Sequence, residues 1–166
     1  EICACLVGSE MCIRDSNCVA KQPEILLRKK APIIITPHPG EMSRLTGLAT
    51  PLVNAERERV ALDFAQKYGV VTVLKGAGTV IASPNGKVLV NPTGNSGMAT
   101  GGSGDVLAGM TASILAQGAS AFSSAAAAVY LHGLAGDIAA EKYGKISMLP
   151  TDLINCIPLA YKRCGF

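Results

Sequence analysis

The sequence predicts an α/β fold built around a parallel β-sheet, and three observations lead to this prediction. Two short runs of apolar and β-branched residues, 33–36 and 70–74, have the composition of strands buried on both faces. A helical pattern over residues 55–68 lies between them, and this strand–helix–strand order is typical of a βαβ unit with parallel strands. The third observation is a glycine-rich segment, 91–104, that leads directly into another helical pattern. A chain of 166 residues suits one domain.

The composition excludes several classes of protein. The chain is 49% hydrophobic and only 16% charged, which excludes a disordered protein. No apolar run reaches the length of a membrane-spanning helix. Aromatic residues make up 4% and the net charge is +3, so we expect neither a nucleic-acid nor a membrane partner. The six cysteines show no Cys-x-x-Cys and no metal-ligand spacing, which favours a reducing, cytoplasmic setting without disulfides.

The first sixteen residues differ from the rest of the chain. Segment 7–16 resembles a translated sequencing adapter, and residues 1–16 lack the basic start and the cleavage site of a signal peptide. We therefore expect residues 1–16 to be a non-native leader, with a genuine divergent terminus as the alternative. Residues 17–166 then form the folded part, which begins with an amphipathic stretch at 17–30.

The strand at 33–36 is expected to end at a proline-rich turn. Its last residue is followed by Pro37-His38-Pro39-Gly40-Glu41, where two prolines hold His38 away from helix geometry. A short helix is predicted from Glu41 to about Leu45, ending at Gly47.

Asn54 is a good N-cap residue for the helix predicted over 55–68, which Gly69 ends. The strand at 70–74 follows, and the turn Lys75–Thr79 lies at its carboxyl end. In open α/β sheets, ligands bind at the carboxyl ends of the strands. The turn is therefore a candidate binding segment, with an ordinary strand-to-strand turn as the alternative.

Residues 79–82 and 87–91 are expected to pair as a hairpin around Ser83-Pro84-Asn85-Gly86. Three further helices are predicted: 105–117 stopped by Gly118, 121–142 stopped by Gly144, and 151–163 with Pro150 before its cap. Pro158 is expected to kink or shorten the last of them.

The glycine-rich segment predicts an anion-binding site at a helix N-terminus. Six of residues 91–110 are glycine, and Gly101, Gly102 and Gly104 directly precede or open the helix. The first N–H groups of a helix have no partner within it, and the helix dipole favours a negative charge in front of them. Asp105 stands at this position, either as a helix cap or as a general base for phosphoryl transfer.

Segment 91–110 lacks the lysine of a Walker loop, and Leu107 stands where a Gly-x-Gly-x-x-Gly motif needs glycine. Gly102-Ser103-Gly104-Asp105 instead resembles the Gly-x-Gly-Asp motif of the ribokinase-like superfamily. The longer run 91–109 resembles the NAD(P)H-hydrate dehydratases within it, and Thr36-Pro37-His38-Pro39-Gly40-Glu41 matches that family's Thr-Pro-His-x-Gly-Glu motif. The Lys-Gly-Ala-Gly-Thr form at 75–79 is similar to the ADP-dependent members.

This resemblance implies a ribokinase-like three-layer αβα sandwich with a mainly parallel central sheet. It covers only the C-terminal portion of such a domain, truncated at the N-terminus. The implied reaction is the ADP-dependent dehydration of hydrated NAD(P)H back to NAD(P)H, a nicotinamide nucleotide repair step with AMP and phosphate as products. Mg²⁺ is expected with ADP or ATP as co-substrate, and the parent protein is expected to be a homo-oligomer, a tetramer.

The resemblance also implies residue roles. Asp105 is the catalytic base and contacts the hydrated NAD(P)H together with His38. No side chain is expected to ligate a metal. The nucleotide-binding residues are Lys75, Gly76, Ala77, Gly78, Thr79 and Gly104, and the anion hole comprises Gly101, Gly102, Ser103 and Gly104.

Several of these residues have plainer interpretations. His38 could be a surface histidine in a turn, and Glu41 is expected to cap the following helix rather than to act in catalysis. His132 is expected to be a satisfied, partly buried histidine. Asp137 and Asp152 are interpreted as helix-face and helix-N-terminal charges. Residues 91–97 could be a turn only, although a phosphate or nucleotide role is favoured.

Two other functions fit parts of the sequence. One is a small-alcohol, vitamin-precursor kinase of the same fold, which would lack the Thr-Pro-His-x-Gly-Glu motif and would leave a stable phosphoester. The other is an inactive nucleotide-binding fragment, because a truncated parallel sheet exposes an edge strand. We therefore expect the chain as written to be poorly soluble or to oligomerise through that edge.

Overall fold

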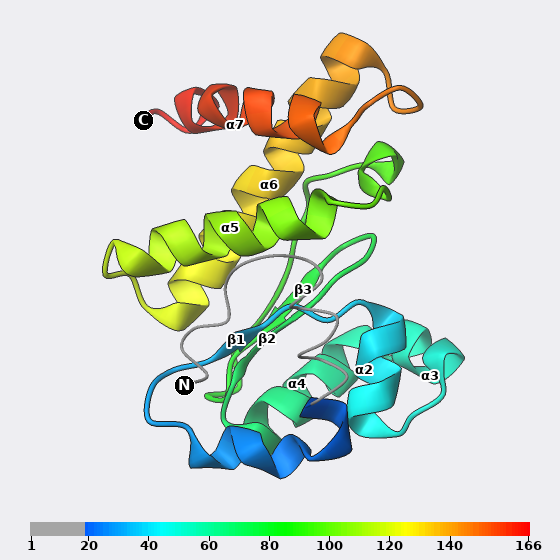
Figure 1. The fold of residues 1–166 in the computed structure, drawn as a ribbon, viewed down its shortest axis with the longest axis vertical. Helices are drawn as coiled ribbons and strands as arrows, with labels where there is room; N and C mark the ends of the chain where they lie inside the picture. The colour runs from blue at the N-terminus through cyan, green and yellow to red at the C-terminus, as the bar shows by residue number, and fades with distance from the viewer. Residues whose placement is uncertain (1–18) are drawn as a thin grey trace.

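A computed structural model of the chain describes residues 19–166 (Figure 1). The predicted leader, residues 1–16, lies outside these described residues. The strands form one sheet in the order β1-β2-β3-β4. Their bounds are β1 Ile34–Ile35, β2 Val71–Leu74, β3 Val80–Ala82 and β4 Val88–Val90.

The sheet is mixed rather than mainly parallel over the described residues. Strands β1 and β2 pair in parallel, with Ile34 opposite Val71, and this confirms the predicted βαβ unit. Strands β3 and β4 pair antiparallel, which confirms the predicted hairpin. Strand β3 also pairs antiparallel with β2, because the turn 75–79 is far too short for the crossover of a dozen or more residues that a parallel neighbour needs.

The helices follow the predicted order, with differences at their starts. Their bounds are η1 Pro23–Arg28, α2 Pro39–Thr46, α3 Thr50–Ala55, α4 Arg57–Tyr68, η2 Ser96–Met98, α5 Ser103–Ala116, α6 Ala121–Tyr143 and α7 Pro150–Arg163. The predicted stops at Gly47 and Gly69 are confirmed, because both residues adopt left-handed conformations as C-caps. Helix α7 continues through Pro158, which therefore does not shorten it.

The predicted N-cap at Asn54 is wrong. Asn54 lies inside α3, an element that the sequence analysis did not predict, and Glu56 is the N-cap of α4. Pro51 sits in the first turn of α3, where its fixed φ favours helix. The chain therefore enters helix four residues before Asn54, and this residue cannot begin the next one.

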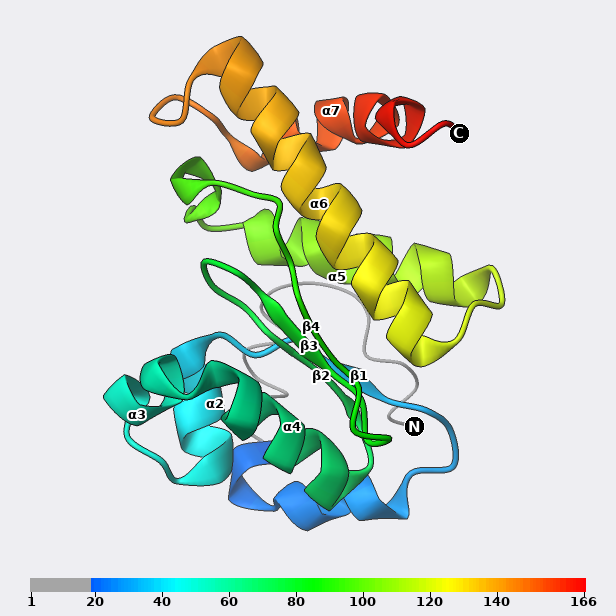
Figure 2. The same cartoon turned by 180° about the vertical axis from the view of Figure 1, so that it is seen from behind.

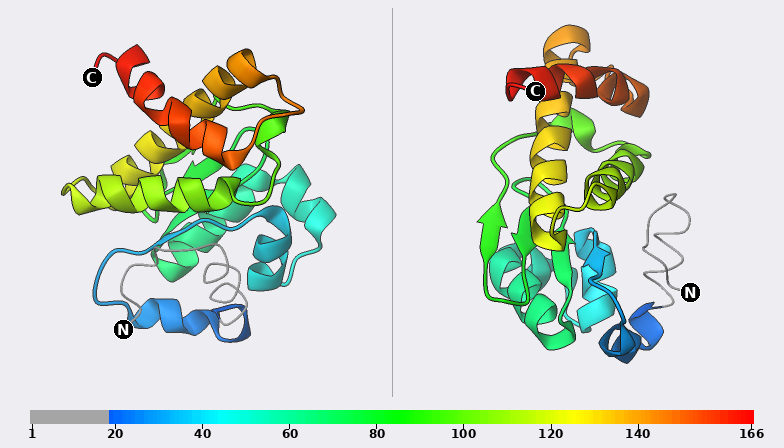
Figure 3. Two further views of the ribbon diagram at one scale, coloured as in Figure 1. Left: turned by 45° about the horizontal axis from the view of Figure 1, so that its top comes forward. Right: turned by 90° about the vertical axis from the view of Figure 1, so that its left-hand side faces the viewer.

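Helices cover both faces of the sheet, which gives three layers (Figures 1 and 2). Helices α2, α3 and α4 lie on one face, and α5 and α6 lie on the other. A hydrophobic core lies on each face of the sheet, and residues of β2 contribute to both. Val71 and Val73 pack with residues of α5 and α6, while Leu74 packs with residues of α4. Helix α7 packs on α6, away from the sheet (Figure 3).

The parallel pair β1–β2 sets up the candidate site, because the chain leaves both strands at the same edge of the sheet. Strand β1 leads to Pro37 and His38, and β2 leads to Lys75. The Lys75 N–H donates to the Pro37 carbonyl oxygen at 2.8 Å, which ties the two exits together. No helix within residues 19–166 is long and apolar enough to cross a membrane.

Candidate functional site

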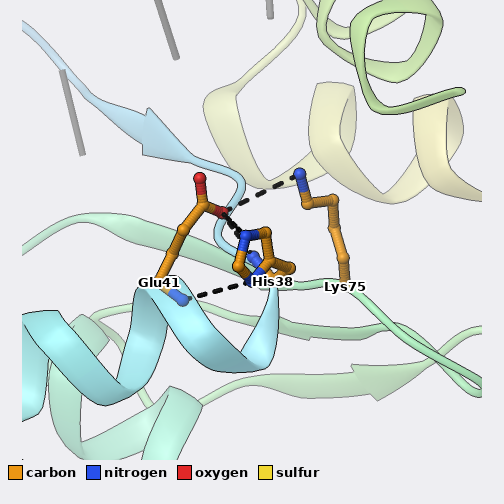
Figure 4. Close-up of polar contacts among 3 residues, drawn as sticks. All are labelled: His38, Glu41 and Lys75. Atoms are coloured by element: carbon orange, nitrogen blue, oxygen red, sulfur yellow. Dashed lines mark hydrogen bonds and ion pairs between the residues drawn. The ribbon is translucent and has the colours of Figure 1, made fainter. Parts of the chain in front are cut away.

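His38 and Glu41 form a capping box at the start of α2 (Figure 4). The Glu41 N–H donates to His38 Nδ1 at 3.2 Å, and the His38 N–H donates to Glu41 Oε2 at 2.7 Å. The predicted helix-capping role of Glu41 is confirmed. Because Nδ1 accepts a hydrogen bond, a neutral His38 ring carries its proton on Nε2. The side chain is 47% exposed, so this N–H can reach a ligand.

Lys75 connects this capping box to α5. Its Nζ lies 4.0 Å from Glu41 Oε2, and the Glu41 side chain is only 3% exposed (Figure 4). The same Nζ lies against Gly104 of α5: a Cβ built on Gly104 would lie 3.2 Å from it. The ammonium group therefore stands between a buried carboxylate and the first turn of α5, as the prediction of a cation near phosphates requires.

The N-terminus of α5 has the predicted loop-to-helix geometry. Gly102 is the N-cap with φ +97°, a left-handed conformation that favours glycine. The N–H groups of Ser103 and Asp105 donate within the turn, to Thr100 and Gly102. Among the described residues, the Gly104 N–H has no such acceptor, so it is free to meet an anion.

Asp105 lies in the first turn of α5 beside this donor. Within residues 19–166, no side chain makes a capping hydrogen bond to α5, so the alternative of Asp105 as a helix cap is wrong. Its carboxylate is half-buried and stays free for other chemistry. The structure thus brings Lys75 to Gly104, the residue before Asp105, although Lys75 lies 29 residues before Gly104 in the sequence.

His132 supports the anion hole from behind. Its Nε2 lies 2.9 Å from the Ser103 carbonyl oxygen and 3.4 Å from Ser103 Oγ. Burial lowers the pKa of His132 to about 4, the Ser103 hydrogen bond raises it and nearby Lys75 lowers it further. The ring is therefore neutral near pH 7 and donates Nε2–H to Ser103. The prediction of a satisfied histidine is confirmed, although the side chain is buried rather than partly buried.

Residues 91–97 are anchored to α6. The Asn91 amide donates to the carbonyl oxygens of Thr93 and Val129, and the Gly94 N–H donates to Asp137 Oδ2 at 2.8 Å. Asp137 also accepts from Asn95. The interpretation of Asp137 as a plain helix-face charge is therefore wrong, because it holds this loop. A phosphate or nucleotide role for residues 91–97 stays a prediction.

Asp152 behaves as predicted, as a charge at a helix N-terminus. Its Oδ2 accepts the Leu149 N–H at 2.9 Å at the start of α7. The first residue of α7, Pro150, packs against Gly102, where a Cβ would lie 3.2 Å from Pro150 Cγ. Helix α7 thus supports the anion hole through packing rather than through its charge.

The turn Lys75–Thr79 contains two glycines with positive φ. Gly76 and Gly78 have φ values of +148° and +62°. The Thr79 hydroxyl donates to the Gly76 carbonyl oxygen at 3.1 Å, which closes the turn. A residue that the sequence analysis did not single out, Arg57, also binds this turn. No local pattern marks it, because its partners are remote in sequence.

A dedicated metal cage is not part of the described site. Residues 19–166 contain no group of three His, Cys, Asp or Glu side chains that could hold a metal ion. The two cysteines within them, Cys156 and Cys164, are free.

Known proteins resemble this chain over most of its length. The family model described as NAD(P)H-hydrate dehydratase matches residues 13–159, most of the chain. The chain belongs to this family. It is 45% identical over 147 residues to the bifunctional NAD(P)H-hydrate repair enzyme Nnr of Moorella thermoacetica, a match that covers 89% of this chain and 28% of that protein. It is 36% identical over 151 residues to the ADP-dependent (S)-NAD(P)H-hydrate dehydratase of Bacillus subtilis, covering 91% of this chain and 54% of that protein.

Solved structures confirm the ribokinase-like fold of this chain. The ADP/ATP-dependent NAD(P)H-hydrate dehydratase of Bacillus subtilis, co-crystallised with ATP and Mg²⁺, matches with a TM-score of 0.77 and 38% identity. That match covers 80% of this chain and 48% of that chain. A hydroxyethylthiazole kinase from Pyrococcus horikoshii matches with a TM-score of 0.67 at 18% identity, a likeness of fold alone. This chain thus spans about half the length of its single-function relative and 28% of a bifunctional one.

Proposed function

We propose that this chain carries the nucleotide site and part of the substrate site of an ADP-dependent NAD(P)H-hydrate dehydratase. One observation carries the proposal: Lys75 Nζ lies against Gly104 in the first turn of α5, where the Gly104 N–H has no acceptor among the described residues and Asp105 is the next residue. A positive side chain and a helix N-terminus together favour a phosphate group. A free carboxylate beside that phosphate suits a base that acts on a hydroxyl group.

The proposed reaction couples phosphoryl transfer to elimination. Asp105 takes the proton of the ring hydroxyl of hydrated NAD(P)H, and the hydroxyl oxygen attacks the terminal phosphorus of ADP. The bond from that phosphorus to the bridging oxygen breaks, and AMP leaves. The phosphorylated ring then loses phosphate through C–O cleavage, and a neighbouring C–H proton leaves as the ring double bond returns.

The described residues have distinct parts in this proposal. The Gly104 N–H and the Lys75 ammonium face the transferred phosphoryl group, where one preorganised donor is worth roughly 10²- to 10³-fold in rate. His38 offers its Nε2–H to the substrate, since its Nδ1 is occupied by the Glu41 N–H. The turn 75–79 holds the rest of the nucleotide.

Mg²⁺ would neutralise phosphate charge when it is bound with the nucleotide. Mg²⁺ is usually bound through one or two carboxylates, substrate phosphates and water rather than by an all-protein cage. The chain's own contribution to charge balance is then Lys75 and the N-terminus of α5.

Assembly of identical chains is also part of the proposal. Large apolar side chains lie exposed around α7, among them Ile146, Leu149 and Phe166. Strand β1 forms one edge of the described sheet. Sedimentation velocity should show a homo-oligomer at micromolar concentration, and a single monomeric species would contradict this part of the proposal. Cytoplasmic localisation stays a prediction.

The decisive experiment combines binding and turnover. ADP is titrated with Mg²⁺ by calorimetry into the chain and into Asp105→Asn, and recovery of NADH absorbance is followed with hydrated NADH. We expect both proteins to bind ADP, and Asp105→Asn to lose roughly 10²- to 10⁴-fold in rate. Free phosphate should appear with NADH. A stable phosphoester would indicate a kinase, and full activity in Asp105→Asn would refute the assigned base.

A further inference from the structure

Arg57 reaches from the first residue of α4 to the turn that follows β2. Its Nη2 donates to the Leu74 carbonyl oxygen at 2.9 Å and to the Gly78 carbonyl oxygen at 3.3 Å. These two carbonyl groups stand at the two ends of the segment Lys75–Ala77. One guanidinium group therefore spans the mouth of the turn and fixes the separation of its ends.

The position of Arg57 is unfavourable for α4 itself. A cation at the first residue of a helix faces the positive end of the helix dipole. Burial lowers the pKa of Arg57, and its Nε is buried without a hydrogen-bond partner among the described residues. Neither effect stabilises α4, so we attribute the position of Arg57 to the turn, whose carbonyl groups its guanidinium binds.

The turn is shaped around this guanidinium. Gly76 has φ +148°, and a Cβ at this position would collide with the Arg57 guanidinium. Glycine is thus required at position 76 both by its backbone conformation and by the group packed against it. Arg57 and Gly76 form a matched pair across 19 residues of sequence. Both hydrogen bonds to the turn come from Nη2, while Nη1 lies against Gly76, so a lysine could replace the donor but not the planar group that packs on the glycine.

We infer that Arg57 is a positioning residue for the nucleotide: it holds the turn 75–79 so that Lys75 stays directed at the first turn of α5. This inference rests on the proposed function of that turn. Arg57 also lines an open groove of about 670 Å³ between the α3–α4 junction and Gly78. A shortened side chain therefore leaves a space that a small guanidinium ion can enter from solvent.

The test uses the whole chain with Arg57→Ala, Arg57→Lys and a matched control, Arg59→Ala. Arg59 lies two residues further along the same helix, 61% exposed and paired with Glu56. We expect Arg57→Ala to bind ADP roughly tenfold more weakly and Arg57→Lys to recover little of that loss. The affinity for hydrated NADH should stay within twofold, and Arg59→Ala should behave as the parent chain. Added methylguanidinium should restore ADP binding to Arg57→Ala.

Amide hydrogen exchange without any ligand separates this inference from the proposed function. In Arg57→Ala, two amides at the ends of the turn should exchange at least tenfold faster: that of Lys75, which donates to the Pro37 carbonyl oxygen, and that of Asn91, which donates to the Thr79 carbonyl oxygen. Amides in the middle of α5, such as Leu107, should be unchanged. Unchanged exchange in the turn would overturn the inference even if ADP binds. Faster exchange throughout the chain would also overturn it, since it would show a general loss of stability. If the parent chain does not bind ADP, the proposed function fails, and the exchange result still decides what Arg57 holds.

Discussion

Replacing Gly104 by alanine should make the protein more stable and a worse nucleotide binder. Gly104 is the second residue of α5 and its φ is not positive, so its backbone accepts alanine without strain. Alanine favours a helix over glycine by up to about 1 kcal/mol. For a chain of this length, that gain raises the melting temperature by about 2–4 °C.

The added methyl group acts differently on the anion site. Its carbon would lie 3.2 Å from Lys75 Nζ, so the ammonium must move by a few tenths of an ångström. The methyl group also stands beside the free Gly104 N–H, where the phosphate is proposed to bind. A hydrogen bond to a charged group contributes about 1.5–3 kcal/mol. Loss of one such contact raises the Kd for ADP by roughly 10- to 100-fold.

Gly109→Ala is the matched control for this substitution. Gly109 lies in the same helix, is exposed, and a Cβ there would meet no atom within 4 Å. It should raise the melting temperature to a similar extent and leave ADP binding unchanged. The measurements are thermal melts followed by circular dichroism and calorimetric titration with ADP and Mg²⁺. Wild-type ADP affinity in Gly104→Ala would refute the assignment of the α5 N-terminus as the phosphate site.

Three further predictions concern stability. The pKa of His132 falls from an ordinary 6.5 to about 4, so acid favours the unfolded state, in which the ring binds a proton more readily. The contribution of His132 to the free energy of unfolding is complete above pH 6.5 and falls by roughly 3 kcal/mol by pH 4. The free energy of unfolding, measured with urea between pH 7.5 and pH 4.5, should fall less steeply with acid in His132→Gln than in the parent chain. Equal pH dependence in the two proteins would exclude a neutral buried ring. Glu41→Ala should cost about 1–2 kcal/mol by removing the capping box, whereas Glu41→Gln keeps an acceptor oxygen and should cost less than half as much; equal losses would contradict the cap. Gly133→Ala should cost about 1–3 kcal/mol in urea unfolding, because its Cβ would lie 2.7 Å from the Thr93 carbonyl carbon, and a neutral effect would show that this loop can move aside.

Local signals in the sequence predicted the parts of the fold that local physics decides. Gly47 and Gly69 predicted the helix ends correctly. The residue after a helix often adopts a left-handed conformation, and glycine adopts it most easily. The β-branched runs around 34 and 72 became the parallel pair. The capping role of Glu41 was predicted because its partner lies only three residues away, whereas the part of His38 as the N-cap of α2 was not.

The features that sequence reasoning missed depend on contacts between remote segments. Asp137 looks like an ordinary helix-face charge until the Gly94–Asn95 loop folds onto α6, more than forty residues away. From the sequence alone, Gly133 is a residue that lowers the stability of a helix. In the structure, its lack of a side chain lets that loop approach the helix backbone. Arg57 carries no motif at all. In each case the role depends on which remote segment the residue contacts, and no local sequence pattern identifies that segment.

The proposed substrate and nucleotide sites are joined by a single oxygen atom. Glu41 Oε2 accepts the His38 N–H, lies 3.7 Å from His38 Nε2, and lies 4.0 Å from Lys75 Nζ (Figure 4). A ligand that displaces Lys75 therefore removes the cationic neighbour of a buried carboxylate, and that carboxylate then depends more on His38. The parallel pairing of β1 and β2 makes this arrangement possible, because it brings the exits of both strands to one edge of the sheet. The two halves of the site are consequently one electrostatic unit, and a change in either half is felt by the other.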